Sequence, residues 1–257
     1  MEAMKKIVIL IALILMVIPA TVFGSVKSGQ DLIAAMYKKY EGKWYRTLTF
    51  VQKTITHKSD GTSEAETWYE AMSVPGKLRI DIEPLDKSNG ILFADGKLFS
   101  IRDGKAAAGR PFVHPLMTLG FDVYHQPVAT TIEQVKGFGI DLASVHQEKW
   151  QGRDVYVIGA AKGDLGKPQV WVDKKNMYFV RLIQLGGRDK KSVQETQFNK
   201  YFKSGGGWVA PEVLFFADGK PATTEEYTEV RTGMTLDPEL WNPEKWMSVD
   251  RTYYKKK

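Results

Sequence analysis

Four Asp-Gly pairs punctuate this chain of 257 residues and divide much of it into short extended runs. They are Asp60-Gly61, Asp95-Gly96, Asp103-Gly104 and Asp218-Gly219, and the segments beside them are rich in β-branched and aromatic residues. An Asp-Gly pair favours the tight turn of a β-hairpin, because both residues tolerate a positive φ angle. The segment between two of the pairs, Leu98 to Arg102, is so short that consecutive hairpins must form an antiparallel meander. The pattern therefore disfavours a parallel α/β fold.

Helical patterns occur at the start of the chain and near its middle. Ser28 and Asp31 form a helix-capping signal, and apolar residues follow at helical spacing until about Gly42. Prolines and glycines then interrupt the strand pattern between Arg110 and Leu142, where two short helices fit. The apolar residues of the first would be Leu116, Met117 and Leu119, and those of the second, which begins at Thr130 or Thr131, would be Ile132 and Val135.

Strand patterns resume at about Leu142 and continue to the final strand, which holds Tyr227 and Val230. The predicted strands between these points are Val155 to Ala160, Gln169 to Val172, Tyr178 to Gln184, Val193 to Phe202 and Trp208 to Phe216. A sheet of roughly ten or more strands should curl into a barrel or half-barrel. The interior of such a barrel can be too large for its side chains to fill, which leaves space for a ligand. The predicted fold is therefore mainly β with a few helices: a curved antiparallel half-barrel with a helical lid.

The N-terminus has the pattern of a secretory signal peptide. Lys5 and Lys6 precede an apolar run from Ile7 to Ile18, and small residues follow as far as Gly24. The run is too short to span a bilayer, which needs about 20 residues. We expect residues 1–24 to be removed, leaving residues 25–257 as one periplasmic domain; the alternative is a retained anchor. Because the sequence contains no cysteine, it has no acylation site after the signal.

The sequence has no recognisable catalytic or metal-binding constellation. Nucleophile-elbow, phosphate-loop and zinc-protease motifs are absent, and Gly137 and Gly139 match only part of a dinucleotide-binding motif. The four histidines have no ligand-like spacing, so His114 and His125 are expected at the surface or as helix caps. The formal charge of +6 is spread along the chain without a basic run interleaved with aromatics. We therefore expect no enzyme activity, no cofactor, no metal and no nucleic-acid partner.

Several blocks of the sequence resemble, in order, the LolA-like superfamily of periplasmic lipid and lipoprotein carriers. The blocks are Tyr45 to Ile101, with Pro75 to Asp81 and Ile91 to Leu98 as its clearest parts, Val170 to Asp173, Tyr178 to Leu182, Gly207 to Pro211 and Leu236 to Pro243. The resemblance implies a half-barrel that holds acyl chains beneath a helical lid. One position departs from it: Val74 stands where the lipoprotein carrier proper has an arginine that ties the lid to the barrel. That departure puts the carrier's specific release mechanism in doubt.

Strand alternation and the resemblance together give a set of candidate lipid-binding residues. Leu78, Ile80 and Ile82 should face the interior, while Lys77, Arg79 and Asp81 should form an outward, charged surface. Alternation leaves open whether Leu92 and Ala94, or Ile91 and Phe93, face inward. The candidates for the cavity and lid are Phe50, Leu78, Ile80, Ile82, Leu92, Phe112, Leu116, Met117, Leu119, Phe121, Ile132 and Val135.

These features predict a monomeric periplasmic protein that binds lipid or lipoprotein acyl chains non-covalently and delivers them toward the outer membrane. Membrane-associated donor and acceptor proteins would be its partners. The alternative is a periplasmic sensor or adaptor that uses the same fold to bind an envelope protein. A second alternative concerns the helical lid: its apolar residues would also fit a static helical plug that fills the core and does not move.

Overall fold

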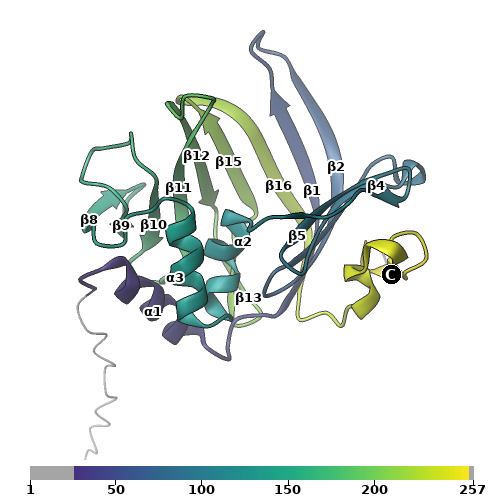
Figure 1. The fold of residues 1–257 in the computed structure, drawn as a ribbon, viewed down its shortest axis with the longest axis horizontal. Coiled ribbons are helices and arrows are strands. Elements are labelled where there is room, and N and C mark those ends of the chain that lie inside the picture. Colours follow the sequence, from purple (N-terminus) through teal and green to yellow (C-terminus); the bar gives the residue numbers. More distant parts are fainter. Residues whose placement is uncertain (1–25, 255–257) are drawn as a thin grey trace, which may run out of the picture.

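The hairpin-rich sequence forms one large, curved antiparallel sheet that bends around a concave face (Figure 1). The computed structural model describes residues 26–254, so the expected signal peptide of residues 1–24 lies outside the described part of the chain. Within residues 26–254, a 14-stranded sheet has the order β6-β5-β4-β3-β2-β1-β16-β15-β12-β11-β10-β9-β8, and β7 pairs with β5. The sheet does not close into a barrel. The predicted fold class, mainly β and antiparallel with a few helices, is confirmed.

Most strands pair with their neighbours in sequence, as a meander requires; the pairing of β1 with β16 joins the two halves of the sheet. The strands are β1 (Thr47–His57), β2 (Ser63–Ser73), β3 (Lys77–Ile82), β4 (Asn89–Ala94), β5 (Lys97–Arg102), β6 (Lys105–Ala106), β7 (Arg110–Pro111), β8 (Val145–Trp150), β9 (Arg153–Ile158), β10 (Gln169–Asp173), β11 (Phe179–Gly186), β12 (Ser192–Asn199), β13 (Phe202–Ser204), β14 (Gly207–Val209), β15 (Glu212–Ala217) and β16 (Lys220–Thr232).

The predicted Asp-Gly turns connect neighbouring strands. At Asp95-Gly96, Asp103-Gly104 and Asp218-Gly219 both residues are left-handed, with φ between 47° and 75°. This is the backbone of a two-residue hairpin turn whose twist matches that of the strands. The Asp60-Gly61 pair differs, because only its glycine has a positive φ and it lies in a wider turn between β1 and β2.

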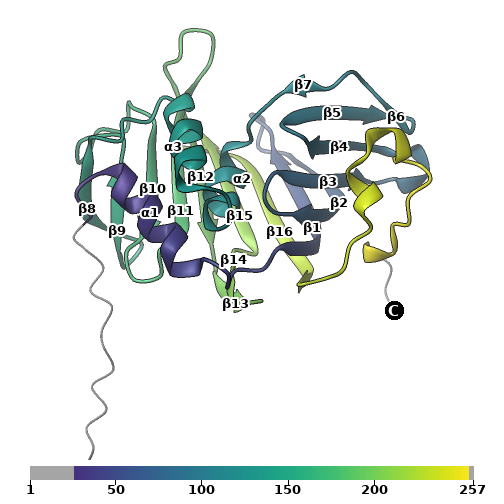
Figure 2. The same ribbon diagram turned by 60° about the horizontal axis from the view of Figure 1, so that its bottom comes forward.

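Three helices lie on the concave side of the sheet (Figures 1 and 2). They are α1 (Gly29–Tyr40), α2 (Pro115–Gly120) and α3 (Val128–Gly137), and the short 3-10 turn η2 (Asp122–Tyr124) follows α2. The hydroxyl of Ser28 accepts the N–H of Asp31 at 3.1 Å, which confirms the predicted cap of α1. Both helices predicted between Arg110 and Leu142 are present, and we call residues 110–142 the helical insertion.

Two of the predicted strands are each divided in two. The stretch from Val193 to Phe202 ends as β12 at Asn199, and the stretch from Trp208 to Phe216 separates into β14 and β15. Lys200 has a positive φ of 57°, and Pro211, which has no N–H to donate, lies between β14 and β15. β13 and β14 form a separate two-stranded sheet.

The C-terminal part of the chain, residues 236–254, covers the convex face over β2–β5 (Figures 1 and 2). We call it the C-terminal strap; it contains the 3-10 turns η3 (Pro238–Trp241), η4 (Pro243–Lys245) and η5 (Thr252–Tyr254). The short turn η1 (Leu85–Lys87) joins β3 to β4. Trp246 of the strap lies directly over Gly90 of β4, where any Cβ would be 2.5 Å from the indole ring. Only glycine therefore permits this close approach.

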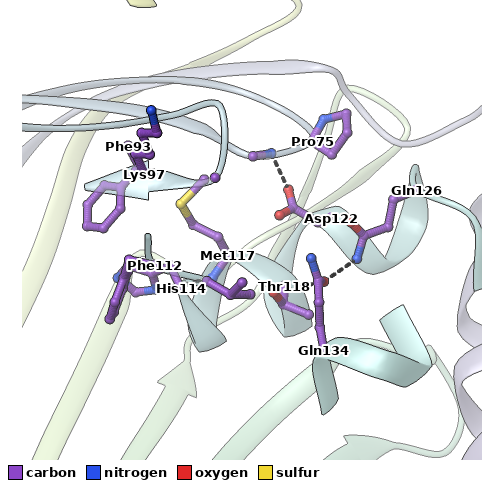
Figure 3. Close-up of a pocket in the computed structure, with 13 residues that line it drawn as sticks. Pro75, Phe93, Lys97, Phe112, His114, Met117, Thr118, Asp122, Gln126 and Gln134 are labelled. Carbon is purple, nitrogen blue, oxygen red and sulfur yellow. Dashed lines mark hydrogen bonds between the residues drawn. The ribbon is translucent and has the colours of Figure 1, made fainter. Parts of the chain in front are cut away.

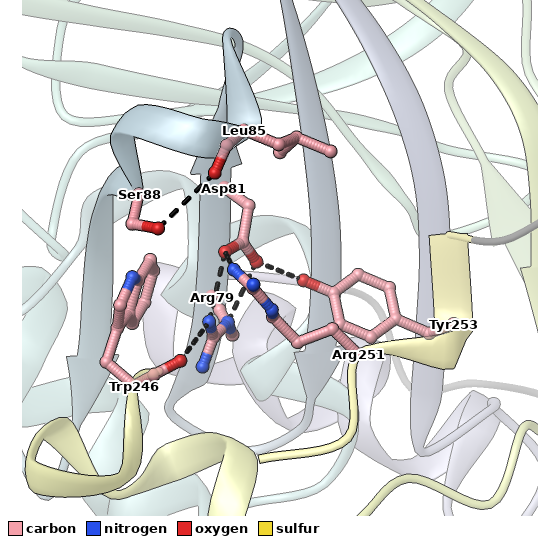
Figure 4. Close-up of polar contacts among 7 residues, drawn as sticks. All are labelled: Arg79, Asp81, Leu85, Ser88, Trp246, Arg251 and Tyr253. Atoms are coloured by element: carbon pink, nitrogen blue, oxygen red, sulfur yellow. Dashed lines mark hydrogen bonds and ion pairs between the residues drawn. The ribbon is translucent and has the colours of Figure 1, made fainter. Parts of the chain in front are cut away.

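The strap overturns the predicted outward charged surface on β3. Arg79 and Asp81 do point away from the concave face, but they are 0% and 1% exposed because the strap covers them. The Arg79 guanidinium donates to the Asp81 carboxylate at 2.8 Å and 3.0 Å and to the backbone oxygen of Trp246 at 3.0 Å (Figure 4). Arg251 and Tyr253 of the strap also donate to Asp81. The charges are thus paired inside the protein.

Leu92 belongs to the same convex cluster. It is fully buried there together with Ala94, Trp246 and other strap residues. Its placement among the cavity residues was therefore wrong; of the two alternatives for β4, Ile91 and Phe93 face the concave side. Among residues 26–254, no helix has the length and apolar character needed to cross a membrane.

Candidate ligand-binding site

Two adjoining cavities lie where α2 meets the concave face of the sheet. The sheet cavity has a volume of about 240 Å³ and is lined mainly by β1–β4, β16 and α2. The turn cavity, of about 230 Å³, lies between the helical insertion and the turns that follow β2 and β4 (Figure 3). Phe93, His114 and Met117 line both cavities. These shared side chains form the partition between the two spaces.

Half of the predicted ligand-binding residues line the sheet cavity. They are Phe50, Leu78, Ile80, Leu116, Met117 and Phe121. Phe112 lies beside them and lines the turn cavity together with Met117. The structure therefore brings together residues from three separate parts of the sequence: β1, β3 and α2.

The other predicted residues lie elsewhere. Leu119 and Val135 are fully buried in the main core, and Ile82 and Ile132 pack against that core without lining either cavity. Tyr124, which lies between α2 and α3 in the insertion, stacks on Trp44 with ring centroids 3.9 Å apart. These contacts give α3, η2 and Leu119 of α2 a structural role, while Leu116 and Met117 of α2 line the cavity.

The cavity is also lined by residues that were not among the predicted ligand-binding residues. The apolar ones are Trp68, Met72, Ile91, Phe93, Phe198 and Phe215, and the polar ones are Gln52, Glu70, His114, Glu225 and Tyr227. Strand alternation was the available signal, because Trp68, Glu70 and Met72 are spaced by two along β2 and so share one face. Alternation alone does not show which strands curve over a cavity.

His114 begins α2 and closes one wall of the site. Its Nδ1 accepts the backbone N–H of Leu116 at 3.2 Å and that of Met117 at 3.4 Å, and Pro115 occupies the first helical position. Its ring meets that of Phe93 edge-on at 5.0 Å. Burial lowers the pKa of His114 to about 4, so its ring is neutral at pH 7. The expected capping role of this histidine is confirmed.

Asp122 connects the helical insertion to the sheet. Its Oδ1 accepts the backbone N–H of Gly76, in the turn between β2 and β3, at 3.0 Å (Figure 3). Burial raises the pKa of Asp122 to about 7, and the hydrogen bond from Gly76 opposes part of that effect. This contact lies next to Val74 and Pro75, at the position where the sequence departs from the resemblance described above.

Two carboxyl groups line the mainly apolar sheet cavity. Glu70 is 4% exposed, and burial and then the charge of Glu225 raise its pKa well above the usual value. Burial raises the pKa of Glu225 to about 7, while hydrogen bonds from Tyr227 and Gln52 counteract part of the rise. Perturbed carboxyl groups in a cavity are candidates for ligand contact. Within residues 26–254, no three potential metal-binding side chains gather at one place.

Comparison with known proteins supports the fold. No family model matches the sequence, and no curated protein matches it. A putative outer membrane lipoprotein-sorting protein domain from Vibrio parahaemolyticus has a similar structure, with a TM-score of 0.58, 16% identity, and coverage of 83% of this chain and 96% of that one. A DUF1329 family protein from Desulfovibrio piger gives a TM-score of 0.56 at 14% identity, covering 83% and 95%.

A LolA superfamily protein from Nitrosomonas europaea is also similar, with a TM-score of 0.52 and 11% identity over 81% of this chain and 96% of that chain. These three structures show that the protein has a LolA-like fold. At identities this low, the likeness extends to the fold alone, and the function has to be argued from the site.

Proposed function

We propose that this protein is a periplasmic carrier that binds the acyl chains of a lipid or lipoprotein non-covalently and delivers them toward the outer membrane. The observation that carries the proposal is the sheet cavity itself, in which apolar side chains of β1–β4 face those of α2 across an unfilled space of about 240 Å³. Binding would be driven by the hydrophobic effect, at about 0.8 kcal/mol for each methylene group removed from water.

The arrangement of α2 suits loading and release. Leu116 and Met117 of α2 and Phe121, the residue that ends it, line the cavity, whereas Leu119 and Val135 of the insertion are buried in the core. Met117 is unbranched and adapts to irregular surfaces. Each cavity is slightly smaller than the ~300–1,000 Å³ usual for small-molecule sites, so displacement of the shared side chains would join the two spaces around a long chain.

The proposal includes export of residues 25–257 as a single monomeric domain, with residues 1–24 removed, and it assigns the site no catalytic step. The proposal is supported by the similar fold of the outer membrane lipoprotein-sorting protein domain from Vibrio parahaemolyticus. Donor and acceptor proteins at the two membranes would complete the transfer.

Two measurements test the proposal. An environment-sensitive apolar dye should bind the folded protein and be displaced by long-chain lipids, but not by water-soluble controls. Native mass spectrometry of the protein purified from its own periplasm should show a bound lipid or lipoprotein. A stoichiometric protein partner without lipid would favour a sensor or adaptor. Dye fluorescence that rises only on denaturation would mean that the interior is a filled core.

A further inference from the structure

The carboxyl group of Glu70 has no partner within the described part of the chain. Its cross-strand neighbours are Phe50 on β1 and Ile80 on β3, neither of which has a side-chain donor. The residue is 4% exposed and lines the sheet cavity. Its oxygens are not among the enclosed side-chain atoms that lack a partner within residues 26–254, so they remain open to the space of the cavity. A partner for Glu70 would therefore have to come from the contents of the cavity.

The second carboxyl group, Glu225, strengthens the acidic character of the same space. It lies on β16, beyond β1 from Glu70, and accepts a hydrogen bond from Tyr227 at 3.1 Å. The two carboxyl groups interact electrostatically, since the charge of Glu225 raises the pKa of Glu70. A positive charge between or beside them would reverse this effect and stabilise both ionised forms.

No lysine or arginine among residues 26–254 lines the cavity and supplies that charge. The residues that line the sheet cavity include no lysine or arginine, and the one histidine, His114, is neutral at pH 7. Trp68, Phe50 and Tyr227 line the cavity with the two carboxyl groups; Phe50 and Tyr227 stack with ring centroids 4.1 Å apart, so each has at most one face free to attract a cation. An anionic head group would meet like charge and ring faces there, whereas a cationic one would meet complementary groups.

We propose that the sheet cavity accepts an amphiphile that carries an ammonium group, with its chain among the apolar side chains and its ammonium group donating to Glu70. Glu225 adds a second negative charge close by. This inference rests on the proposed carrier function, because it names the class of ligand that the same cavity takes. Any proton held by either carboxyl group is released to water when the ammonium group binds.

Three ligands with the same chain length and different head groups test the inference: dodecylamine, dodecanol and dodecanoate. Each is titrated below its micelle concentration into the full protein, and binding is measured by calorimetry and by displacement of the apolar dye. We expect dodecylamine to bind roughly tenfold or more tightly than dodecanol, because a charge-assisted hydrogen bond is stronger than a neutral one. Dodecanoate should bind more weakly than either.

Variants identify the group that is responsible. Glu70→Gln keeps the shape of the side chain and removes its charge, so it should lower dodecylamine affinity roughly tenfold and leave dodecanol affinity unchanged. Glu225→Gln should have a smaller effect in the same direction, since Glu225 already has a donor in Tyr227. Glu226→Gln is the matched control, because this neighbouring carboxylate is exposed and does not line the cavity. It should bind all three ligands like the unmodified protein.

The pH profile provides a readout that does not depend on folding of the variants. The groups of β1, β16 and α2 that face the two carboxyl groups are Gln52, Tyr227 and His114. None of these becomes charged between pH 6 and 8, given the pKa of His114 near 4 and the raised pKa of Tyr227. Dodecylamine affinity should therefore rise as the pH passes through about 7, where Glu225 ionises. Dodecanol affinity should not rise.

The outcomes separate this inference from the function on which it rests. Equal affinity for dodecylamine and dodecanol, or preference for dodecanoate, would overturn the inference and leave the carrier proposal in place. Failure of all three ligands to bind would count against the carrier proposal itself. Preference for dodecylamine that survives Glu70→Gln and Glu225→Gln together, or a flat pH profile, would place the ammonium group elsewhere and also overturn the inference.

Discussion

The carboxyl group of Asp122 accepts the backbone N–H of Gly76 at 3.0 Å, and so joins the helical insertion to the turn between β2 and β3. Burial raises the pKa of this carboxyl group to about 7. The group therefore changes its charge near neutral pH at the contact between the insertion and the sheet. Because the N–H of Gly76 can donate to either form, the hydrogen bond persists while the cost of desolvation changes.

The first prediction follows from that charge. The folded protein holds the Asp122 proton up to a pKa of about 7, whereas the unfolded chain releases it near 3.8. The stabilisation is thus fully present below pH 3.8 and is lost as the pH rises through 7. Asp122→Asn keeps the acceptor for Gly76 without the charge, so its urea midpoint should fall less than that of the unmodified protein as the pH rises from about 4 to 7.

Asp86→Asn is the control, since Asp86 is exposed and lies outside both cavities. It should leave the pH profile unchanged. If the urea midpoint of Asp122→Asn changes with pH as that of the unmodified protein does, burial does not raise the pKa of Asp122 and the prediction is wrong.

The second prediction concerns the histidine that caps α2. The pKa of His114 is near 6.5 in the unfolded chain and about 4 in the folded protein, so acid protonates the unfolded chain first. Its contribution to stability is therefore present above pH 6.5 and is lost as the pH falls toward 4. His114→Asn, which retains a capping acceptor, should show a smaller loss over that range. Loss of a helix cap typically costs about 1 kcal/mol, so His114→Ala should be destabilised by at least that amount at pH 7.

Denaturant unfolding at a series of pH values measures both effects. His57→Asn is a suitable comparison, because His57 lies at the end of β1 and hydrogen-bonds Thr224 outside the cavity. An equal acid response in His114→Asn and the unmodified protein would contradict the assignment of the capping nitrogen.

The third prediction tests the C-terminal strap. Arg79 pairs with Asp81 inside the protein, and its guanidinium lies 3.6 Å from the ring centroid of Trp246. Arg79→Met leaves the Asp81 carboxylate buried with fewer donors, and breaking a buried pair in this way costs roughly 3–5 kcal/mol. Replacing Trp246 with alanine should cost a similar amount through the cavity that it leaves, roughly 3–5 kcal/mol.

Double-mutant cycles on Arg79 and Trp246 show whether the two act as a unit. Because the side chains are in contact, the loss in the double variant should be smaller than the sum of the single losses. Lys53→Met is a control for removing a surface charge, as its contact with Glu226 is exposed. It should change stability by less than about 1 kcal/mol. Additive losses would mean that the strap is not held through this contact.

The sequence was sufficient for the sheet because its signals are local. Asp95-Gly96 and Asp218-Gly219 fix hairpin turns through the backbone angles of two residues, and alternation along β3 correctly places Leu78 and Arg79 on opposite faces. Local signals also located α2 and α3. In each case the information needed lay within a few residues of the feature predicted.

What could not be predicted depends on contacts between distant parts of the chain. Arg79 and Asp81 read as a solvated surface, because nothing near them in sequence shows that Trp246 and Tyr253, about 170 residues later, cover them. For the same reason, the sequence could not decide whether Leu92 or Ile91 faces the concave side, because Leu92 is covered by the distant C-terminal strap. Glu70 was not selected either, since a carboxylate on a strand is ordinarily exposed and only the curvature of the sheet buries it beside Phe50.

The last prediction decides whether α2 is a mobile lid or a plug, and it compares a single and a double alanine variant on one helix. Leu116 lines the sheet cavity, whereas Leu119, three residues later, is 2% exposed in the filled core and lines neither cavity. Leu119→Ala should cost roughly 2–5 kcal/mol, because a new cavity replaces close packing. Leu116→Ala combined with Met117→Ala should cost less, since both side chains already border empty space.

Lipid binding should show the opposite order. The double variant Leu116→Ala and Met117→Ala loses contacts with the ligand chain, each buried methylene being worth about 0.8 kcal/mol, so its lipid affinity should fall severalfold or more. Leu119→Ala should bind lipid normally in every molecule that remains folded. Urea midpoints and dye-displacement constants on the same samples give both quantities. A large decrease in the urea midpoint of the double variant, with unchanged lipid affinity per folded molecule, would mean that α2 is part of a static core. The carrier proposal would then have no mobile lid to support it.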